Sequence, residues 1–151
     1  MGKVRGKVVS INISDKRGVR KKPVKEAVIK ADFGIEDDAH ASSKWHRQVS
    51  LLAIESIRKM QAMGLKVKPG DFAENITTED IDLLKLPIGT KMTIGENIEA
   101  EVSQIGKKCH TRCEIYKQAG DCIMPKEGIF VKIIKGGKVR EGDEITVRNK
   151  D

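Results

Sequence analysis

Apolar and polar residues alternate with a period of two along several stretches of the chain. In the first stretch, Val9, Ile11 and Ile13 share one face, and serine and asparagine occupy the other. Such alternation predicts β-strands with one buried face, and closely spaced strands predict an antiparallel barrel or sandwich. The alternating stretches are VVSINIS (8–14), NIEAEVSQI (97–105), GIFVKII (128–134) and EITV (144–147). The turn signals between the later ones lie at 95–97, 136–137 and 141–143.

One stretch has the spacing of an amphipathic helix instead. LLAIESIRKMQAMG (51–64) places Ala53, Ile57 and Met60 on one face, with Ile54 beside them. Gly64 follows the last apolar position, where glycine commonly ends a helix. The sequence therefore predicts a helix packed against the sheet and ending before Gly64.

Length and charge narrow the class of protein. A chain of 151 residues predicts one domain, which we expect to span 1–151. No run approaches the roughly 18 apolar residues of a membrane-spanning helix, and the N-terminus does not read as a signal peptide, so we expect a cytoplasmic protein. The net charge is +7, from 29 basic and 22 acidic residues. One Trp, one Tyr and three Phe are too few for a base-stacking platform, which disfavours nucleic acid as a partner.

All three cysteines of the chain lie in the basic stretch 107–128. An odd, clustered set favours a reducing compartment and a reactive, metal-binding or redox role over a disulfide framework. We expect a short helix at 110–119, which would place Cys109 and Cys113 on one face. A Gly-Asp turn would then bring Cys122 back towards them.

Cys109 is the strongest candidate for a reactive thiol. Cationic neighbours lower the pKa of a thiol, and the thiolate is both the nucleophile and the soft-metal ligand. The cations around Cys109 are Lys107, Lys108, His110 and Arg112. Two alternatives stay open. The thiols are buried small hydrophobes, or they bind zinc with a fourth ligand from His40, His46 or His110, although the spacing is not that of paired CxxC motifs.

A run of six basic residues without an acid lies between Lys16 and Lys25. Its position between two strand signals predicts a loop. Such a loop is either a solvated charge run or an anion-binding loop in which arginine clamps a phosphate and lysine supplies a point charge.

Two further groups of polar residues are candidates. Asp37 and Asp38 with His40 and His46 form a set of metal-ligand types, although a structural role is commoner for residues without ligand spacing on one element. Asn75, in the polar stretch AEN, either holds a ligand or fixes a turn.

Four stretches in register resemble the MOSC domain, the module named after the C-terminal domain of molybdenum-cofactor sulfurases. They are DDAHASSKWHRQVSLLA, PGDFAENITTEDID, LPIGTKMTIGENIEAEVSQIGKKCH and GIFVKIIKGGKVREGDEITV, and the resemblance covers about residues 3–147. The resemblance implies a mainly β fold, a closed barrel similar to the β-barrel domain of pyruvate kinase, with a few short helices. This expectation agrees with the alternation.

The resemblance also implies a site. The position of the family's cysteine is Cys109, which would accept sulfur as a persulfide from a cysteine desulfurase or ligate molybdenum. The implied cofactor is molybdopterin, and the implied partners are a cysteine desulfurase and molybdenum-cofactor enzymes or biosynthetic proteins. Pyridoxal phosphate binding is implied at the level of the family. The residues that would bind the cofactor are Arg17, Arg20, Lys22, His40, Arg47, Asn75 and Arg112.

The chain departs from the family pattern around its cysteine. Lys108 stands where many members have proline, and Cys113 and Cys122 follow as candidates for a sulfur relay or a metal cluster. This resembles a bacterial subgroup of small, single-domain members. Two other functions are therefore weighed: a molybdenum-dependent reductase of N-hydroxylated compounds with an external electron donor, and a zinc or cluster-binding module. The extra barrel domain and electron-transfer modules of reductase members are absent from the sequence, which weakens the reductase hypothesis.

Overall fold

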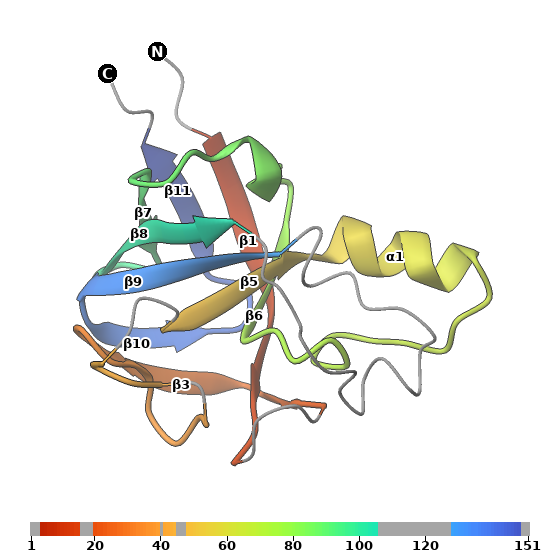
Figure 1. Cartoon of the computed structure of the whole chain (residues 1–151), viewed down its shortest axis with the longest axis horizontal. Helices are drawn as coiled ribbons and strands as arrows, with labels where there is room; N and C mark the ends of the chain where they lie inside the picture. The colour runs from red at the N-terminus through yellow and green to blue at the C-terminus, as the bar shows by residue number, and fades with distance from the viewer. Residues whose placement is uncertain (1–3, 16–19, 40, 45–47, 106–127, 149–151) are drawn as a thin grey trace.

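The computed structural model describes residues 4–15, 20–39, 41–44, 48–105 and 128–148, and β-strands are the main secondary structure of this part of the chain. Seven strands form a barrel: β1 (Val4–Ile13), β5 (Val49–Ala53), β6 (Ile76–Glu79), β7 (Lys91–Ile94), β8 (Ile98–Ile105), β9 (Ile129–Lys135) and β11 (Glu144–Arg148). Hydrogen-bonded neighbours follow the order β11, β7, β8, β9, β5, β6, β1, and β1 pairs with β11 to close the ring (Figure 1). The predicted mainly β closed barrel is confirmed.

The remaining described strands extend or flank the barrel. β2 (Lys22–Val24) pairs with the end of β1, and a separate three-stranded sheet has the order β10 (Gly137–Arg140), β3 (Glu26–Lys30), β4 (Gly34–Ile35). Within the described residues, the helical elements are α1 (Ile54–Ala62) and the 3₁₀ turn η1 (Leu83–Lys85). The predicted helix at 110–119 lies outside the described residues.

Three of the four predicted alternations are confirmed by burial. Along β8, Ile98, Ala100 and Val102 are buried in the barrel interior, whereas the residues between them are partly exposed. In β9 and β11 the interior positions are Ile129, Val131, Ile133, Ile145 and Val147. A period of two therefore places one apolar row inside the barrel, as expected for strands of a closed sheet.

The prediction for β1 is confirmed for Ile11 and Ile13, which pack in or against the main core, and is wrong for Val9. The pairing register with β6 shifts between Val8 and Ser10, so that Val8 and Ile11 both enter the barrel interior while Val9 packs outside it. Such an irregularity adds one residue to a strand, so that the residues after it point to the opposite face of the sheet from the one that strict alternation predicts. Ser10 and Asn12, expected on a solvent face, are buried. Both faces of this half of β1 are therefore covered.

The helix begins later than the sequence pattern indicated. The first three residues of the predicted helix belong to β5, and Ala53 has an extended backbone with φ −73° and ψ 140°. Ile57 and Met60 lie on the buried face as predicted. Gly64 follows the C-cap residue with φ +93°, which confirms its role as the residue that ends the helix. No helix within the described residues is long and apolar enough to cross a membrane.

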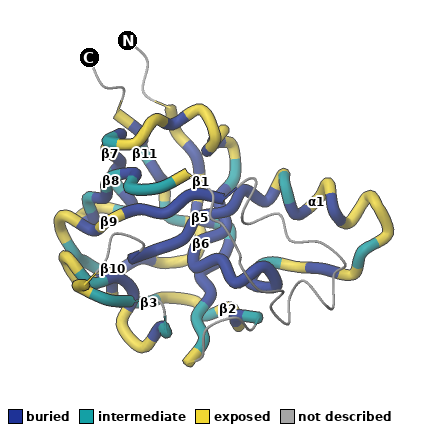
Figure 2. Tube along the Cα trace, viewed as in Figure 1, coloured by how far each residue is buried: buried dark blue, intermediate teal, exposed yellow. Residues whose placement is uncertain are grey.

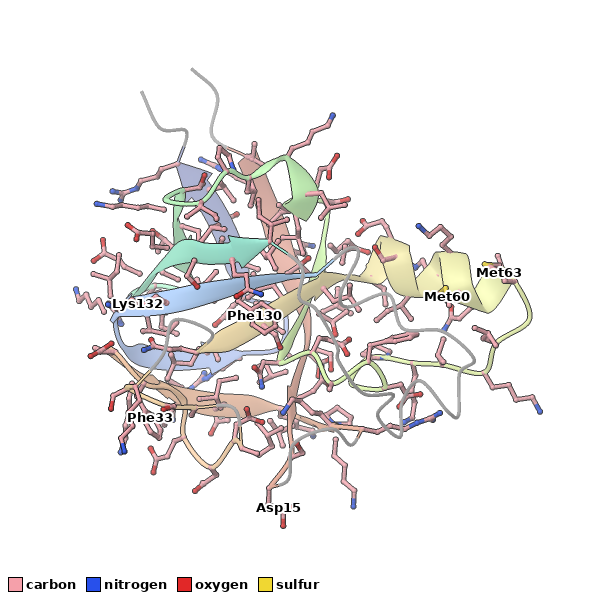
Figure 3. The ribbon with its side chains drawn as sticks, in the orientation of Figure 1. Asp15, Phe33, Met60, Met63, Phe130 and Lys132 are labelled. Atoms are coloured by element: carbon pink, nitrogen blue, oxygen red, sulfur yellow. The ribbon has the colours of Figure 1, made fainter. Side chains whose placement is uncertain are left out.

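A second apolar cluster lies on the outer face of the barrel, between α1, the segment 65–73 and strands β5 and β9. Phe130 of β9 and Met60 of α1 belong to it, and Figure 3 shows both side chains. Its buried members are Leu52, Ile54, Ile57, Met60, Val67, Phe72, Ala73 and Phe130. Figure 2 shows the buried backbone running from the barrel strands into this outer layer. The barrel wall at β5 is therefore packed on both sides.

A substitution at Gly6 provides a test of how the barrel closes between β1 and β11. It pairs with Ile145 of β11, and a Cβ at this position would collide with the carbonyl oxygen of Glu79 and the side chain of Ile81. We expect Gly6→Ala to lower the free energy of unfolding by about 1–3 kcal/mol, the usual cost of overpacking. The measurement is denaturant unfolding. The matched control is Lys7→Ala at the next, exposed position, and equal effects of the two substitutions would contradict the packing of this seam.

Candidate functional site

Most of the residues implied by the family resemblance lie outside the described residues. These are Cys109, Cys113, Cys122, Arg17, His40, Arg47 and Arg112. The structure describes Arg20, Lys22 and Asn75, and it describes the strands that flank the cysteine stretch. The site is therefore built from these anchoring elements.

Both ends of the connection that carries the cysteines are fixed at neighbouring points of the barrel. Ile105 is the last residue of β8, Ile129 is the first of β9, and the two are paired across the strands. Ile129 also pairs with Leu51 of β5, just before that strand leads into α1. All three cysteines of the chain thus belong to one connection that leaves and re-enters the barrel at the same end.

Asn75 joins three strands at the start of β6. Its Oδ1 accepts a hydrogen bond from the backbone N–H of Ser50 (3.0 Å), and its Nδ2 donates to the carbonyl oxygen of Asn12 (3.3 Å). The backbone N–H of Asn12 donates to the carbonyl oxygen of Asn75 at 2.6 Å. The Asn75 side chain is fully buried. These contacts support the chain-fixing role weighed for Asn75 from the sequence, and its role as a pocket residue stays a prediction.

Glu74, beside Asn75, is a fully buried carboxyl group in a polar network. Thr77 Oγ1 donates to its Oε2 (2.8 Å), and the backbone N–H of Phe72 donates to Oε1 (3.3 Å). Burial raises the pKa of Glu74 to about 7, because the hydrogen bonds that favour the carboxylate only partly offset its loss of hydration. The preceding residue, Ala73, has φ +62°, a left-handed conformation that costs free energy in residues other than glycine. The AEN stretch is therefore a strained, ordered segment.

The basic run is not a loop throughout, which corrects the sequence-based interpretation. Lys22–Val24 forms β2, and Lys21 is buried. Lys21 Nζ lies 2.7 Å from Asp38 Oδ1 and 3.0 Å from Ser14 Oγ. Burial alone would raise the pKa of Asp38, but the Lys21 ammonium and hydrogen bonds from Lys21, Asn75 and Ser14 outweigh it and lower the pKa. Lys21 is thus part of the interior rather than an anion clamp.

The ion pair with Lys21 gives Asp38 a structural role. Its Oδ1 accepts hydrogen bonds from Lys21 and from the backbone N–H of Ser14, which is the structural role weighed against a metal site. Among the described residues, no three His, Cys, Asp or Glu side chains are grouped to hold a metal ion. His40 and His46, the other members of the predicted set, lie outside the described residues.

The two described arginine and lysine candidates of the basic run have different surroundings. Arg20 Nη1 lies 3.2 Å from Asp71 Oδ2, and its side chain is 36% exposed. Lys22 is exposed on β2. The cofactor contacts predicted for both residues stay predictions.

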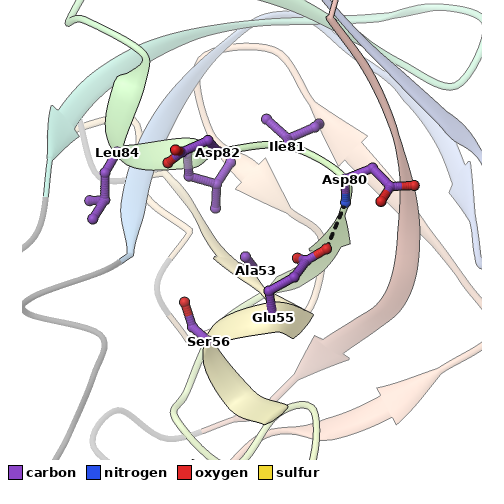
Figure 4. Close-up of a pocket in the computed structure, with 8 residues that line it drawn as sticks. Ala53, Glu55, Ser56, Asp80, Ile81, Asp82 and Leu84 are labelled. Atoms are coloured by element: carbon purple, nitrogen blue, oxygen red, sulfur yellow. Dashed lines mark hydrogen bonds between the residues drawn. The ribbon is translucent and has the colours of Figure 1, made fainter. Parts of the chain in front are cut away.

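A surface hollow of about 340 Å3 lies beside the start of α1 (Figure 4). Glu55, Asp80 and Asp82 line it, together with apolar residues of η1 and β5. The backbone N–H of Asp80 donates to Glu55 Oε2 at 3.0 Å, and Asp80 has φ +68°. One of the three carboxylates is thus already used to hold the turn after β6.

Several buried polar residues were not identified as important from the sequence. The alternation places Asn12 on the polar face of its strand, the basic run places Lys21 in a loop, and no sequence signal points to Thr77. For Glu74 the available signal is the polar stretch AEN between Phe72 and Ile76, which is more consistent with an ordered segment than with a plain loop. Pairing partners more than 60 residues apart, such as Asn12 and Thr77, leave no local pattern.

The closed barrel with its β8–β9 connection defines a barrel-type domain that carries its thiols on one strand connection. Residues 36–146 match the MOSC domain, and the chain belongs to the MOSC domain family. This family is generally associated with the molybdenum cofactor and with sulfurase-like function. The matched range contains all three cysteines and Asn75.

Solved structures of other proteins share the fold of this chain. The YuaD protein from Bacillus subtilis is 19% identical, with a TM-score of 0.82, and 99% of each chain is covered. YiiM from Geobacillus stearothermophilus is 19% identical with a TM-score of 0.71, covering 95% of this chain and 75% of that one. YiiM from Escherichia coli is also 19% identical, with a TM-score of 0.68, covering 97% and 71%. At this identity the likeness shows the fold. No curated protein matches the sequence significantly.

The buried carboxyl group makes stability depend on pH. Glu74 titrates near 7 in the folded protein and near 4.5 when unfolded, so the unfolded chain loses this proton first as the pH rises. This contribution to the free energy of unfolding is present below pH 4.5 and is lost as the pH rises through 7, by up to about 3 kcal/mol. Glu74→Gln, which keeps a neutral side chain, is expected to remove this loss.

The measurement compares urea unfolding of the wild type and Glu74→Gln at about pH 5 and about pH 8. The variant is expected to gain stability relative to the wild type at the higher pH. Glu141→Gln, at an exposed position, serves as the control with the same chemical change. The same pH dependence in Glu74→Gln and the wild type would show that this carboxyl group does not titrate between the two states as described.

Proposed function

We propose that this MOSC-domain protein is a sulfur carrier that accepts sulfur as a persulfide on Cys109. The observation that supports this most directly is the placement of every cysteine of the chain in the one connection between the paired residues Ile105 and Ile129. A carrier needs a thiol on a segment that partners can approach, held by a scaffold that stays folded during exchange. The barrel supplies that scaffold, and the family match covers the connection.

The transfer step requires no external oxidant. The donor is a persulfide, R–S–SH, on the active cysteine of a cysteine desulfurase. The Cys109 thiolate attacks the outer sulfur, a new S–S bond forms at Cys109, and the donor S–S bond breaks. The donor cysteine leaves as a thiolate, so that one sulfur atom moves and the electron count is unchanged. The cationic flank of Cys109 favours the thiolate that this attack needs.

Cys113 and Cys122 extend the proposal to a relay. A thiolate at either position that attacks the outer sulfur of the Cys109 persulfide would take over the sulfur and restore the Cys109 thiolate, again without net oxidation. The acceptor at the end would be a molybdenum-cofactor enzyme or biosynthetic protein. We place this exchange in the cytoplasm, where thiols stay reduced.

The molybdenum cofactor fits the chemistry of the residues present in the chain. A cysteine thiolate is a soft ligand suited to such a metal, and a described residue of the basic run, Arg20, has a buried Nε without a hydrogen-bond partner among the described residues. When bound, the cofactor would supply a metal centre for oxygen or sulfur transfer. Cys109 would ligate it, and Arg20 and Lys22 would hold its phosphate.

The two alternative functions differ from a sulfur carrier because each requires a metal that stays bound to the protein. A reductase of N-hydroxylated compounds would keep molybdenum bound through Cys109 and would need an external electron donor. A zinc or cluster-binding module would keep one metal per chain, lost on replacing any of the three cysteines. Metal analysis of the purified protein therefore separates both from a carrier without a resident metal.

The carrier role predicts a mass change at one residue. After incubation with a cysteine desulfurase and cysteine, the wild type is expected to gain one sulfur atom, which a reductant removes, and Cys109→Ser is expected to gain none. The measurement is the denaturing intact mass. Cys113→Ser and Cys122→Ser are the matched controls, since a carrier centred on Cys109 still loads when either is replaced.

Two results would overturn the assignment. A Cys109→Ser protein that loads fully would exclude Cys109 as the first acceptor. A wild-type protein that does not load, with a donor shown to be active on another acceptor, would exclude the carrier role. Circular dichroism of each variant would show that the fold is retained.

A further inference from the structure

A second hollow, of about 370 Å3, lies where the segment after α1 meets the start of β2. Three cationic side chains line it: Arg20, Lys66 and Lys68. Leu65 and Val67 are apolar residues of its lining, and the carboxylate in the lining is Asp71. Segments about 50 residues apart in the sequence therefore converge on one basic cavity.

The cavity has more positive than negative charge. Asp71 is buried, and it is shared: Arg20 Nη1 lies 3.2 Å from its Oδ2 and Lys68 Nζ lies 3.3 Å from its Oδ1. One carboxylate thus faces two cations, and Lys66 adds a third. Two positive charges remain in excess at a concave surface, where a low-dielectric wall strengthens their attraction for an anion.

The Arg20 side chain is held by Asp71, and one of its N–H donors has no hydrogen-bond partner among the described residues. Its Nη1 is bound to Asp71, but its Nε is buried and has no hydrogen-bond partner among the described residues. A buried donor without a partner is uncommon and calls for an explanation, and an anion that reaches the guanidinium is one. A guanidinium presents its donors as a rigid fork that matches phosphate oxygens.

The backbone around this cavity is fixed before any ligand arrives. The N–H of Lys21 donates to the carbonyl oxygen of Gly70 at 2.8 Å, which ties the Arg20 segment to the Asp71 segment. Gly70 has φ +92°, and a Cβ there would collide with the carbonyl oxygen of Lys21. The backbone N–H of Lys68 donates to Asp71 Oδ2 at 3.1 Å. Little backbone freedom is therefore lost when a ligand binds.

We propose that this cavity binds the phosphate group of a phosphomonoester. Arg20 supplies the fork, Lys66 and Lys68 supply point charges, and Leu65 and Val67 contact the organic part of the ligand. The phosphate of a small metabolite and that of the molybdenum cofactor share this chemistry. The proposal does not depend on sulfur loading at Cys109, because phosphate binding is measured without a thiol.

The test is isothermal titration at constant ionic strength, which holds the screening of exposed charges fixed. The probes are inorganic phosphate, pyridoxine 5′-phosphate and, without a phosphate, pyridoxine. We expect the two phosphates to bind and pyridoxine not to bind. Lys66→Glu is expected to weaken phosphate binding about tenfold or more, since one hydrogen bond to a charged group has about that value.

Two further variants control for folding and for general charge. Arg20→Lys keeps the charge next to Asp71 but removes the fork, and it is expected to weaken binding while the unfolding midpoint stays close to that of the wild type. Lys135→Glu makes the same charge change at the far end of β9 from α1 and should leave binding unchanged (Figure 1). Equal phosphate affinity in Lys66→Glu and the wild type, or equal weakening in Lys66→Glu and Lys135→Glu, would overturn the proposal.

A separate measurement, on protein from a host that makes the cofactor, identifies the source of the phosphate. Pterin content is compared between the wild type and Lys66→Glu. Loss of pterin together with phosphate affinity identifies the cofactor as the ligand. Lost phosphate affinity with the same pterin content identifies a separate phosphomonoester. Pyridoxine that binds as tightly as its phosphate would show that the cavity does not select phosphate at all.

Discussion

The hydrogen bonds of the Asn75 side chain join β1, β5 and the start of β6, where two parallel strands pair in the barrel. Among the described strand pairs, β5 with β6 is the one parallel pair, and parallel neighbours need a long crossover between them. Here the crossover contains α1 and the extended segment up to Asn75. At its end, a single amide binds Ser50 of β5 and Asn12 of β1, so that β6 enters the sheet between two strands already placed.

The rest of the outer layer depends on this joint. The buried Glu74 precedes Asn75 in this segment, and Thr77 Oγ1, which accepts a hydrogen bond from Asn12 Nδ2, donates to its Oε2. The same segment places Asp71 under Arg20 and so shapes the basic cavity. On the opposite side of β5, the pairing of Leu51 with Ile129 fixes the end of the barrel from which the cysteine connection starts. A structural joint and two candidate sites thus share one wall of the barrel.

The sequence predicts the parts of this fold that depend on neighbouring residues. The alternation in β8, β9 and β11 is local, and each of these strands has one face in the barrel interior, so the pattern and the burial agree. In β1 the same reasoning fails at Val9, because the pairing with β6 is irregular between Val8 and Ser10. It also fails for the polar face, because the crossover covers Asn12 there. The burial of Lys21 could not be predicted from the sequence for a related reason. Its partner Asp38 comes from another segment, and a basic run does not indicate which of its lysines is buried. The cysteine cluster could be identified from the sequence, since it depends only on residue type and spacing.

We infer that Asn75 stabilises the barrel and that sulfur chemistry belongs to the cysteine connection. The most direct test is Asn75→Ala, measured for both unfolding and sulfur loading. Removing the amide leaves the backbone N–H of Ser50 and the carbonyl oxygen of Asn12 without these partners, at about 1–3 kcal/mol for each buried group. We expect a lower free energy of unfolding and, at a temperature where the variant is folded, the same one-sulfur loading as the wild type. Unchanged stability with lost loading would contradict this inference and would make Asn75 a residue of the chemical site.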